Sequence, residues 1–287
     1  MELIEKLEKR QREAISLWEL ESLPDKSIVL TFSKEASRRT FEIARHEGLG
    51  RSVFCALHVF EASIEHAEYL LDRIANSDFD LAVSRQEPLL AFLNSARAFK
   101  VFYDGQRVGV LSLSEGATPF ATLRQDLEPT FIKSAAEFFE IHYAHTRRDA
   151  PCEFSFTGVL RVAGILVAAR NEDVEGYSEL RAGLNNVIAL VAKNSAVATV
   201  KSNRLVSFVV GECDYIRLME RAAGVRGSGL TEFAVGVNEE ASGLLDYTKN
   251  SQLNEGVAGL HIALGDGSTG LHIDLLCPGH DLKCSDL

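Results

Sequence analysis

The sequence predicts an α/β protein in two parts: an N-terminal doubly wound α/β domain, then a C-terminal mixed α+β domain that is largely antiparallel or barrel-like. Up to about residue 149, short apolar runs alternate with helix-length segments, the pattern of a parallel sheet covered by helices. Beyond that point, short strand-like runs punctuated by glycine dominate. The 287 residues are enough for one large or two medium domains, which we expect at 1–149 and 150–287.

The expected N-terminal domain opens with an amphipathic helix over residues 2–21, where apolar side chains recur at near-helical spacing. The other expected elements are strands at 26–32, 52–58, 79–84, 98–103 and 108–112, and helices at 35–47, 62–75, 88–97 and 130–146. The first strand leads into Phe32-Ser-Lys-Glu-Ala-Ser rather than a glycine-rich phosphate loop. A nucleotide-binding role for this domain therefore has no support.

The expected C-terminal domain is mostly strands. The pattern predicts one helix at 214–223 and strands at 152–162, 187–192, 196–200 and 205–210. His142 and His145 fall at the end of the expected helix 130–146, where the helix dipole alone explains a histidine. The polar tail from Pro278 onward is typical of a poorly ordered terminus.

The composition narrows the classes of partner. A net charge of −11 argues against nucleic acid or an anionic membrane as the main partner. No run approaches 18 consecutive apolar residues, and the first residues do not resemble a secretory signal. The five cysteines are odd in number and form no CxxC pair, so reduced thiols fit best. These features predict a cytoplasmic protein.

Two apolar runs near the C-terminus, 257–264 and 271–276, are joined by a turn-like glycine-rich segment, which predicts a hairpin. His272 and Asp274 are two residues apart, so they share one face of their strand, and His261 lies on the other strand. A lone histidine on an apolar strand is usually a hydrogen-bonded core residue. Three ligand-type residues within fourteen positions instead favour a metal site, either Fe(II) or, with another carboxylate, Zn²⁺.

This region resembles a known scaffold. Thr231-Glu-Phe-Ala-Val-Gly-Val-Asn, Gly259-Leu-His-Ile-Ala-Leu-Gly and His272-Ile-Asp are similar to the C-terminal metal-site region of aminopeptidase T-like metallopeptidases. The 2,5-dihydroxypyridine ring-cleaving dioxygenases use the same scaffold. The resemblance implies that Glu232, His261, His272 and Asp274 are metal ligands, and that the protein is a homodimer. In the dioxygenases, it implies one iron held by the two histidines and the aspartate.

The sequence also departs from the family pattern. The two-metal site of the family normally includes an upstream acidic residue, whereas the corresponding segment here, 182–192, has no carboxylate. We therefore expect a single divalent metal, Zn or Fe(II). Glu232 could be a fourth ligand or could face solvent. Glu255 could act as a general base, or it could lie outside the metal ligands and contact a metal-bound water. It could also simply be a solvated residue before a strand.

Three functions follow from these expectations. The first is a mononuclear-metal enzyme that binds and modifies a short peptide or peptide-like small molecule, hydrolysing or cyclising it with Zn²⁺ or cleaving a ring with Fe(II) and O₂. The second is a non-catalytic peptide-binding protein with a degenerate metal site, taking an extended peptide at a sheet edge. The third is a dimerising protein with a vestigial site. Shortened members of the scaffold resemble proteins of ribosomal-peptide natural-product biosynthesis, of the crocagin type.

Overall fold

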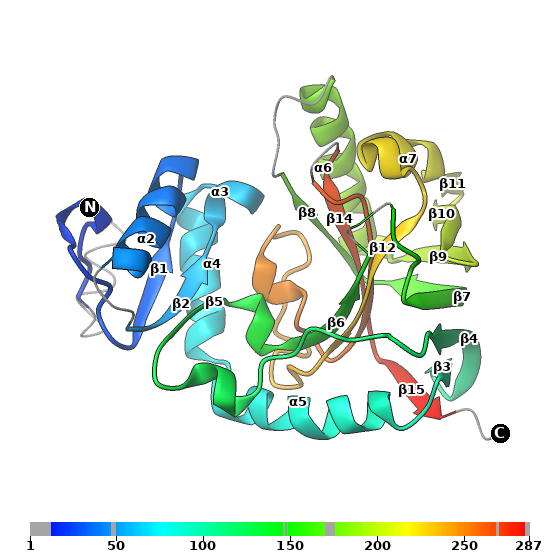
Figure 1. Cartoon of the computed structure of the whole chain (residues 1–287). Helices are drawn as coiled ribbons and strands as arrows, with labels where there is room; N and C mark the ends of the chain where they lie inside the picture. The colour runs from blue at the N-terminus through cyan, green and yellow to red at the C-terminus, as the bar shows by residue number, and fades with distance from the viewer. Residues whose placement is uncertain are drawn as a thin grey trace.

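The computed structural model describes residues 13–46, 50–145, 147, 149–169, 176–267 and 270–284, and its strands form three sheets. One is a three-stranded parallel sheet of order β1-β2-β5, and two are antiparallel sheets of seven and five strands (Figure 1). The predicted mixture of a parallel N-terminal sheet with later antiparallel strands is confirmed. The described strands leave both antiparallel sheets open at their edges, so they do not close into a barrel.

The parallel sheet and its helices form the N-terminal part of the molecule, on the left of Figure 1. Its strands are β1 (Ser27–Leu30), β2 (Arg51–Cys55) and β5 (Phe131–Ser134), and the elements around it are η1 (Leu17–Glu19), α2 (Lys34–His46), α3 (Leu57–Phe60), α4 (Ile64–Ala75) and η2 (Arg124–Leu127). Ser63 caps α4 by accepting a hydrogen bond from the N–H of His66 at 3.2 Å. This region agrees with the predicted alternation of strands and helices.

The predicted strand at 79–84 is wrong, because these residues begin the helix α5 (Phe79–Asn94). Asp78 caps the helix by accepting a hydrogen bond from the N–H of Leu81 at 2.9 Å. The buried side chains of α5 are Ala82, Val83, Gln86 and Leu93. They recur at three to four residues, or at a multiple of that spacing, which fits a helix rather than the alternation of a strand. The cap residue and this spacing are the sequence features that indicate a helix here.

The predicted helix at 130–146 is also wrong. The segment contains β5, a short turn η3 (Ala136–Phe138) and the strand β6 (Glu140–Ala144). Alternate residues of β6 face opposite sides, with Ile141 and Tyr143 in the core. His142 therefore lies on a strand, and the helix-dipole explanation for it does not apply.

The predicted strand at 187–192 is likewise wrong, because it lies within the helix α6 (Tyr177–Asn194). Leu180, Leu184, Val187 and Val191 are buried at helical spacing along α6. A short apolar run of this kind does not distinguish a buried strand from a helix. The predicted helix near 214–223 is present as α7 (Ile216–Ala222), followed by η4 (Gly224–Arg226).

The two antiparallel sheets contain most of the remaining chain. The seven-stranded sheet consists of β11 (Cys213–Asp214), β10 (Arg204–Val210), β9 (Ala196–Lys201), β7 (Phe154–Val162), β4 (Gln106–Leu113), β3 (Ala98–Tyr103) and β15 (His280–Cys284). The five-stranded sheet consists of β6, β12 (Leu230–Gly236), β13 (Gly259–Leu264), β14 (His272–Pro278) and β8 (Gly164–Ala168). The predicted hairpin is confirmed as β13 and β14.

The C-terminal tail is not the poorly ordered segment that the sequence indicates, at least as far as Cys284. It forms β15, which pairs with β3 at the edge of the seven-stranded sheet. His280 is buried, stacks on Tyr103 with ring centroids 4.6 Å apart, and accepts a hydrogen bond from the N–H of Arg161. Apolar and aromatic contacts of this kind hold the tail in place.

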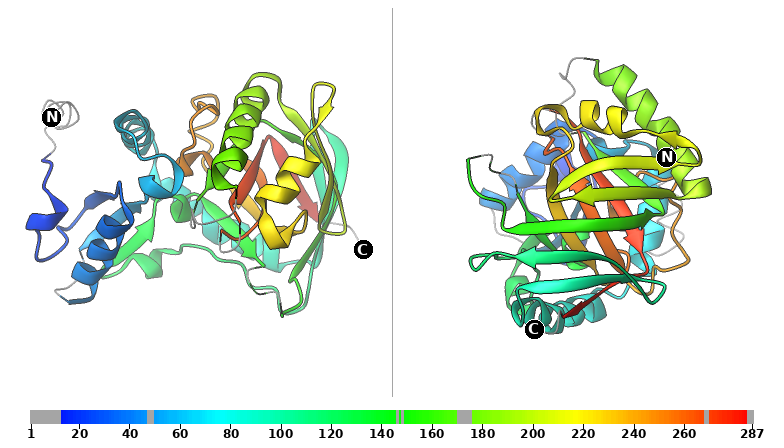
Figure 2. Two further views of the ribbon diagram at one scale, coloured as in Figure 1. Left: turned by 90° about the horizontal axis from the view of Figure 1, so that it is seen from above. Right: turned by 90° about the vertical axis from the view of Figure 1, so that its right-hand side faces the viewer.

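The two antiparallel sheets pack face to face and share the largest hydrophobic core (Figure 2). Residues from both sheets enter it, including Phe99, Val101, Leu111, Phe156, Leu160, Phe233, Leu260, Ile262, Ile273 and Leu275. Because side chains alternate along a strand, the other face of the five-stranded sheet carries a different set of residues. That face is turned toward the parallel sheet (Figure 1), and it carries the polar residues described below.

Three further expectations concern the N-terminal helix, the domain boundary and membrane-spanning helices. The predicted helix at 2–21 lies largely outside the described residues, and its described part, from residue 13, contains only η1. The division into two domains at residue 149 stays a prediction, although both antiparallel sheets draw strands from either side of it. Across the described ranges, no helix combines the length and apolar character needed to cross a membrane.

Candidate metal centre

Acidic and histidine side chains share one face of the five-stranded sheet with small residues. Glu232 on β12 is paired with Ala144 on one side and Ala263 on the other, and Ala263 is paired with Asp274. Directly paired residues in an antiparallel sheet point to the same face. Ala263 therefore leaves open space between the two carboxylates.

The neighbouring row of the sheet follows the same arrangement. Ala234 lies between His142 on β6 and His261 on β13. In the next row, a Cβ atom at Gly236 would lie 2.0 Å from the carbonyl oxygen of Val257, so the position requires glycine. Ligand-type side chains thus alternate with alanine or glycine from strand to strand, and their polar ends can converge above the small residues.

Glu232, His261 and Asp274 form what we call the inner group. Each offers one ligand atom, and these atoms all lie within 4.8 Å of one another. The Nε2 atom of His261 is 3.1 Å from Oε1 of Glu232. His261 and Asp274 are almost completely buried, at 1% and 0% exposure. One histidine and two carboxylates at this distance are a donor set that suits a divalent transition metal.

His272 lies beside the inner group, held by the hairpin turn. Its Nδ1 atom is 3.0 Å from the carbonyl oxygen of Gly265, which has a φ of +68° in the turn after β13. This contact directs Nε2 toward the carboxylates, 3.0 Å from Oδ1 of Asp274 and 3.7 Å from Oε2 of Glu232. A histidine fixed through Nδ1 keeps Nε2 available for a metal ion.

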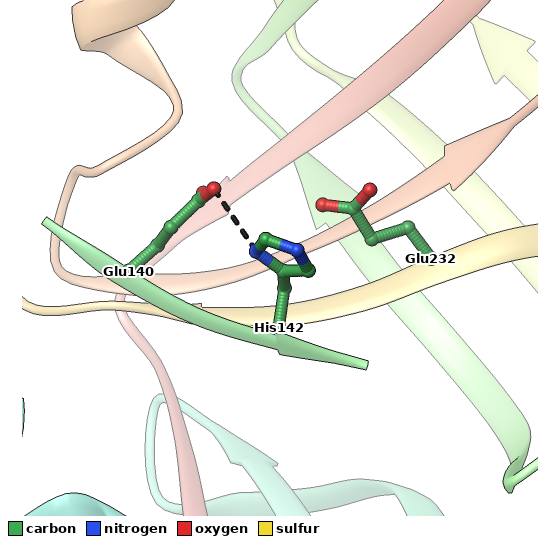
Figure 3. Close-up of side chains that lie close together, drawn as sticks. All are labelled: Glu140, His142 and Glu232. Atoms are coloured by element: carbon green, nitrogen blue, oxygen red, sulfur yellow. Dashed lines mark ion pairs between the residues drawn. The ribbon is translucent and has the colours of Figure 1, made fainter. Parts of the chain in front are cut away.

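Glu140, His142 and Glu232 form an outer group, shown in Figure 3, whose ligand atoms also lie within 4.8 Å of one another. The Nδ1 atom of His142 is 3.3 Å from Oε1 of Glu140. Glu140 also approaches the inner group, because its Oε2 atom is 3.5 Å from Nε2 of His261. Glu232 belongs to both groups.

The charges of the cluster are mutually dependent. Burial alone would lower the pKa of His142 and His272, but the adjacent carboxylates outweigh burial and raise both to about 9. Burial would raise the pKa of Glu232, but its hydrogen bond with His261 and the nearby histidines lower it to about 2. The pKa of His261 is also raised, against the effect of burial, by Glu232 and Glu140. When no cation is bound, the positive charges of the protonated histidines thus offset the negative charges of the carboxylates.

Glu255 differs from the other carboxylates. It follows η5 (Gln252–Asn254) and lies near Asp274. Burial and the charges of Asp274, Glu140 and Glu232 raise the pKa of Glu255 well above its usual range. This shift favours the protonated form of the carboxyl group when no cation is bound. A general base must be ionised, so in this state Glu255 is set up to hold or donate a proton.

Several polar atoms of the cluster are buried without a hydrogen bond from an amide, hydroxyl or ring N–H donor of the described chain. They include Oδ2 of Asp274, Oε2 of Glu140 and Nδ1 of His261. Leaving a buried carboxylate oxygen unbonded costs about 1–3 kcal/mol or more, so native structures rarely retain such groups without a purpose. A divalent cation would satisfy the carboxylate oxygens directly, and the residues present therefore fit a metal ion.

A cavity of about 570 Å³ opens onto the cluster, and we call it the carboxyl-end cavity. It lies at the carboxyl ends of β2 and β5, the position where ligands bind in open parallel sheets. Glu140, His142, Glu232, Glu255 and His272 supply its polar wall. The rest of its lining is largely apolar: Phe54, Ala56, Val59, Phe60, Phe120, Ala121, Lys133, Ser134, Ala136, Glu137, Ala168 and Gln252.

The structure thus brings together all five residues that the sequence singles out: Glu232, Glu255, His261, His272 and Asp274. Their roles as ligands or catalytic groups stay predictions. Sequence reasoning missed Glu140 and His142, because they were expected on a helix. Glu140 on β6 is a further carboxylate beside the inner group, outside the segment 182–192.

Solved structures with a similar fold include two proteins of low sequence identity. The fold is similar to the 2,5-dihydroxypyridine dioxygenase from Pseudomonas putida KT2440, with a TM-score of 0.51 and 11% identity over 91% of this chain and 88% of the other. The wild-type AmpT from Thermus thermophilus gives a TM-score of 0.48 and 14% identity over 90% of this chain and 72% of the other. No curated protein sequence matches the chain.

The likeness to the dioxygenase concerns the fold alone. A family model matches residues 2–285, described as the crocagin biosynthetic protein CgnE/B. Since the match covers nearly the whole sequence, the chain belongs to that family. The predicted resemblance to a shared metallopeptidase and dioxygenase scaffold, and to crocagin-type proteins, is confirmed.

Proposed function

We propose that the chain binds a divalent metal ion in the inner group and binds a short peptide or peptide-like molecule in the carboxyl-end cavity, within a biosynthetic pathway of the crocagin type. The observation that carries the metal site is Asp274, which is fully buried, contacts the ring nitrogen of His272 at 3.0 Å, and offers a ligand atom within 4.8 Å of those of His261 and Glu232. Water cannot stabilise this carboxylate, so a bound cation is its natural partner.

The donor set narrows the metal to Zn²⁺ or Fe(II). His261, Glu232 and Asp274 suit either ion, and His272 stands ready as a further ligand. Such a centre supplies polarisation of a carbonyl group with Zn²⁺, or oxygen chemistry with Fe(II). Glu255 would supply or receive the proton that either chemistry moves, since it lines the cavity beside the cluster.

An extended chain fits the cavity because β5 lies at the edge of the parallel sheet and enters the cavity at Lys133 and Ser134. The N–H of Ala135 bonds to Phe54 on β2, whereas the N–H of Ser134 points away from β2 and bonds to the side chain of Glu137. Ile132, two residues before Ser134, has the same orientation, so its N–H is directed to the open edge. A peptide strand could pair there and extend toward the cluster.

The metal half of the proposal is tested by elemental analysis of protein purified without chelator or affinity-tag metal. We expect about one Zn or Fe per chain in the wild type. Combining His272→Ala with Asp274→Ala should abolish the bound metal without unfolding the protein, as judged by circular dichroism. Unchanged metal content in the double variant would refute the assignment of these ligands.

The peptide half is tested by fluorescence polarisation with a library of labelled short peptides. We expect Ile132→Pro to weaken the best binder at least about tenfold while leaving the metal content unchanged, because proline removes an edge-facing N–H. Ile132 also packs against the small core of Leu23 and Val29, so circular dichroism checks that the variant folds. Arg124→Ala, which lies outside the cavity, is the control and should bind the peptide as the wild type does. Equal affinities of wild type and Ile132→Pro would contradict strand pairing at β5.

A non-catalytic peptide-binding function is the second candidate, and the raised pKa values of His142 and His272 favour it in the metal-free protein. In that state the protonated histidines and the carboxylates already balance, so the cluster can persist without a metal. Peptide binding that survives complete removal of metal by a chelator would support this function. Loss of peptide binding on chelation would support the metal-dependent one.

A further inference from the structure

Lys133 differs from the other charged residues of the carboxyl-end cavity. It is the only lysine or arginine among the described residues that line this cavity. The lining histidines, His142 and His272, already contact carboxylates of the cluster, at 3.3 and 3.0 Å. The other charged side chains of the lining are glutamates: Glu137, Glu140, Glu232 and Glu255. Lys133 is therefore a permanent cation in an otherwise acidic cavity, and it belongs to neither the inner nor the outer group.

Lys133 extends from β5 into the cavity. Ile132, the residue before it, packs against the small core that includes Val29. Neighbouring side chains of a strand point to opposite faces, so Lys133 points to the cavity side. Its side chain is 21% exposed, which means that most of its carbon chain is covered. The ammonium group is thus held at the cavity wall.

Glu137 positions the ammonium group without using all of its donors. Oε2 of Glu137 accepts a hydrogen bond from Nζ of Lys133 at 3.3 Å, and Oε1 accepts one from the N–H of Ser134 at 3.1 Å. An ammonium group has three N–H donors, and this is the only hydrogen bond of Nζ within the described part of the chain. Glu137 is 42% exposed, and an ion pair this accessible to water is weak. Nζ therefore keeps donors and charge for a bound molecule.

The wall that carries Lys133 leads to the residues of the outer group. It runs from β5 through η3 into β6 (Figure 1). The residues of this stretch that line the cavity are Lys133, Ser134, Ala136, Glu137, Glu140 and His142. A negative group on a bound molecule is repelled by the glutamates of the wall and attracted by Lys133. The wall therefore favours one orientation of a molecule that carries a negative charge.

A peptide paired with the open edge of β5 would present a group to this ammonium. Directly opposite residues of paired strands point to the same face, so the peptide residue opposite Lys133 projects into the cavity beside Nζ. Opposite charges at such positions stabilise the pairing of strands. A peptide that ends at this position would place its C-terminal carboxylate there instead.

We propose that Lys133 selects the molecule bound in the carboxyl-end cavity by binding a carboxylate group. The preferred molecules are then peptides that place a C-terminal carboxylate, or the side chain of Asp or Glu, beside β5. This inference rests on the proposed peptide binding and names the chemical class that the site accepts. The hydrogen bond between an ammonium and a carboxylate is roughly twice as strong as one between neutral groups, so an amide is a poor substitute.

Matched pairs of short peptides, labelled at the N-terminus with an uncharged fluorophore, test this proposal by fluorescence polarisation. One series compares a free C-terminal carboxylate with a C-terminal amide, and the other compares Asp or Glu with Asn or Gln at each position. We expect the wild type to bind the charged member of one series at least about tenfold more tightly than the neutral member. In Lys133→Met, which keeps an unbranched apolar side chain, both members should bind as the neutral member binds to the wild type, with unchanged metal content. The series that responds identifies the source of the carboxylate.

Control variants separate the charge at this position from other effects. Lys133→Arg keeps a positive charge and should keep the preference, and Lys201→Met removes an exposed lysine of β9 outside the cavity and should change nothing. Lys133→Gln replaces Lys133→Met if that variant does not fold.

The outcomes distinguish this inference from the proposed function on which it rests. A wild type that binds peptides without any preference, or a preference that persists in Lys133→Met, overturns the role of Lys133 and leaves peptide binding intact. Equal weakening of the charged and neutral members in a folded Lys133→Met would show a structural role and would also overturn it. A wild type that binds no peptide overturns the proposed peptide binding and this inference together.

Discussion

Two cavities lie at opposite ends of the same three-stranded parallel sheet, and they differ in chemistry more than in size. The carboxyl-end cavity has a volume of about 570 Å³, and a second one of about 500 Å³, which we call the amino-end cavity, lies at the starts of β1, β2 and β5. The amino-end cavity is lined by Lys26, Ser27, Ile28, Arg51, Val53, Ile74, Phe79, Asp80, Val83, Arg124, Leu127, Glu128, Phe131 and Phe138.

Volume alone therefore does not identify the functional site. Both cavities are lined by apolar and charged residues, but only the first adjoins the groups of His, Asp and Glu ligand atoms found among the described residues. The difference arises from the five-stranded sheet, whose polar face closes the carboxyl-end cavity. Chemistry at this position is thus contributed by the antiparallel part of the chain, while the parallel part contributes walls and an open edge.

The largest expected effect comes from filling the space between the ligands. Ala234 is fully buried between His142 and His261, so Ala234→Leu would push its side chain into the centre of the cluster. We expect loss of bound metal and a decrease of about 1–3 kcal/mol in the free energy of unfolding. Metal analysis and urea denaturation measure both.

A matched enlargement at the other cavity separates the two effects. Val83 is buried in the lining of the amino-end cavity, and Val83→Leu should lower stability by a similar amount while leaving the metal content unchanged. If both variants lost metal equally, overpacking in general, rather than the space at Ala234, would be the cause. The difference in metal-ligand residues between the two cavities would then not explain the loss of metal.

The sequence predicted the hairpin part of this site because its information is local. His261, His272 and Asp274 lie within fourteen residues, and the turn between β13 and β14 fixes their register. Glu140 and His142 are about ninety residues away from β12, and their position depends on the pairing of β6 with β12. That pairing is a long-range contact which no local pattern specifies.

A local signal for β6 was nevertheless available. In Glu140-Ile-His-Tyr-Ala, polar and apolar residues alternate, as they do in His272-Ile-Asp, and the same two-residue spacing places Glu140 and His142 on one face. The prediction gave more weight to the length of the segment 130–146, which suits a helix, than to this alternation. The other errors, at 79–84 and 187–192, concern short apolar runs whose periodicity is ambiguous, and none of them affects the site.

A smaller effect is expected from pH in chelator-treated protein. The pKa of His142 and of His272 is about 9 in the folded state, against 6.5 for an unperturbed histidine. Their stabilising contribution is therefore fully present below pH 6.5 and is lost as pH rises through 9, by about 3 kcal/mol for each histidine at most. Urea denaturation between pH 6 and pH 9.5 measures the decline.

The loss of folding stability between pH 6 and pH 9.5 should change in a variant and on addition of a metal ion. His142→Gln removes one of the titrating groups, so the loss of stability across the same pH range should be smaller. Added Zn²⁺ competes with protons for the histidines, so stabilisation by metal should increase as pH rises. A wild-type protein whose stability is flat from pH 6 to pH 9.5 would show that the carboxylates do not hold these histidines charged.

The smallest effect is expected from Arg124→Ala in the amino-end cavity. Arg124 lines that cavity, does not line the carboxyl-end cavity, and belongs to neither ligand group. A surface substitution of this kind usually changes stability by about 0.5 kcal/mol or less. Metal content and peptide affinity should both match the wild type. A tenfold loss of peptide affinity would instead mean that the bound molecule reaches both ends of the parallel sheet, with β5, which borders both cavities, as the connection between them.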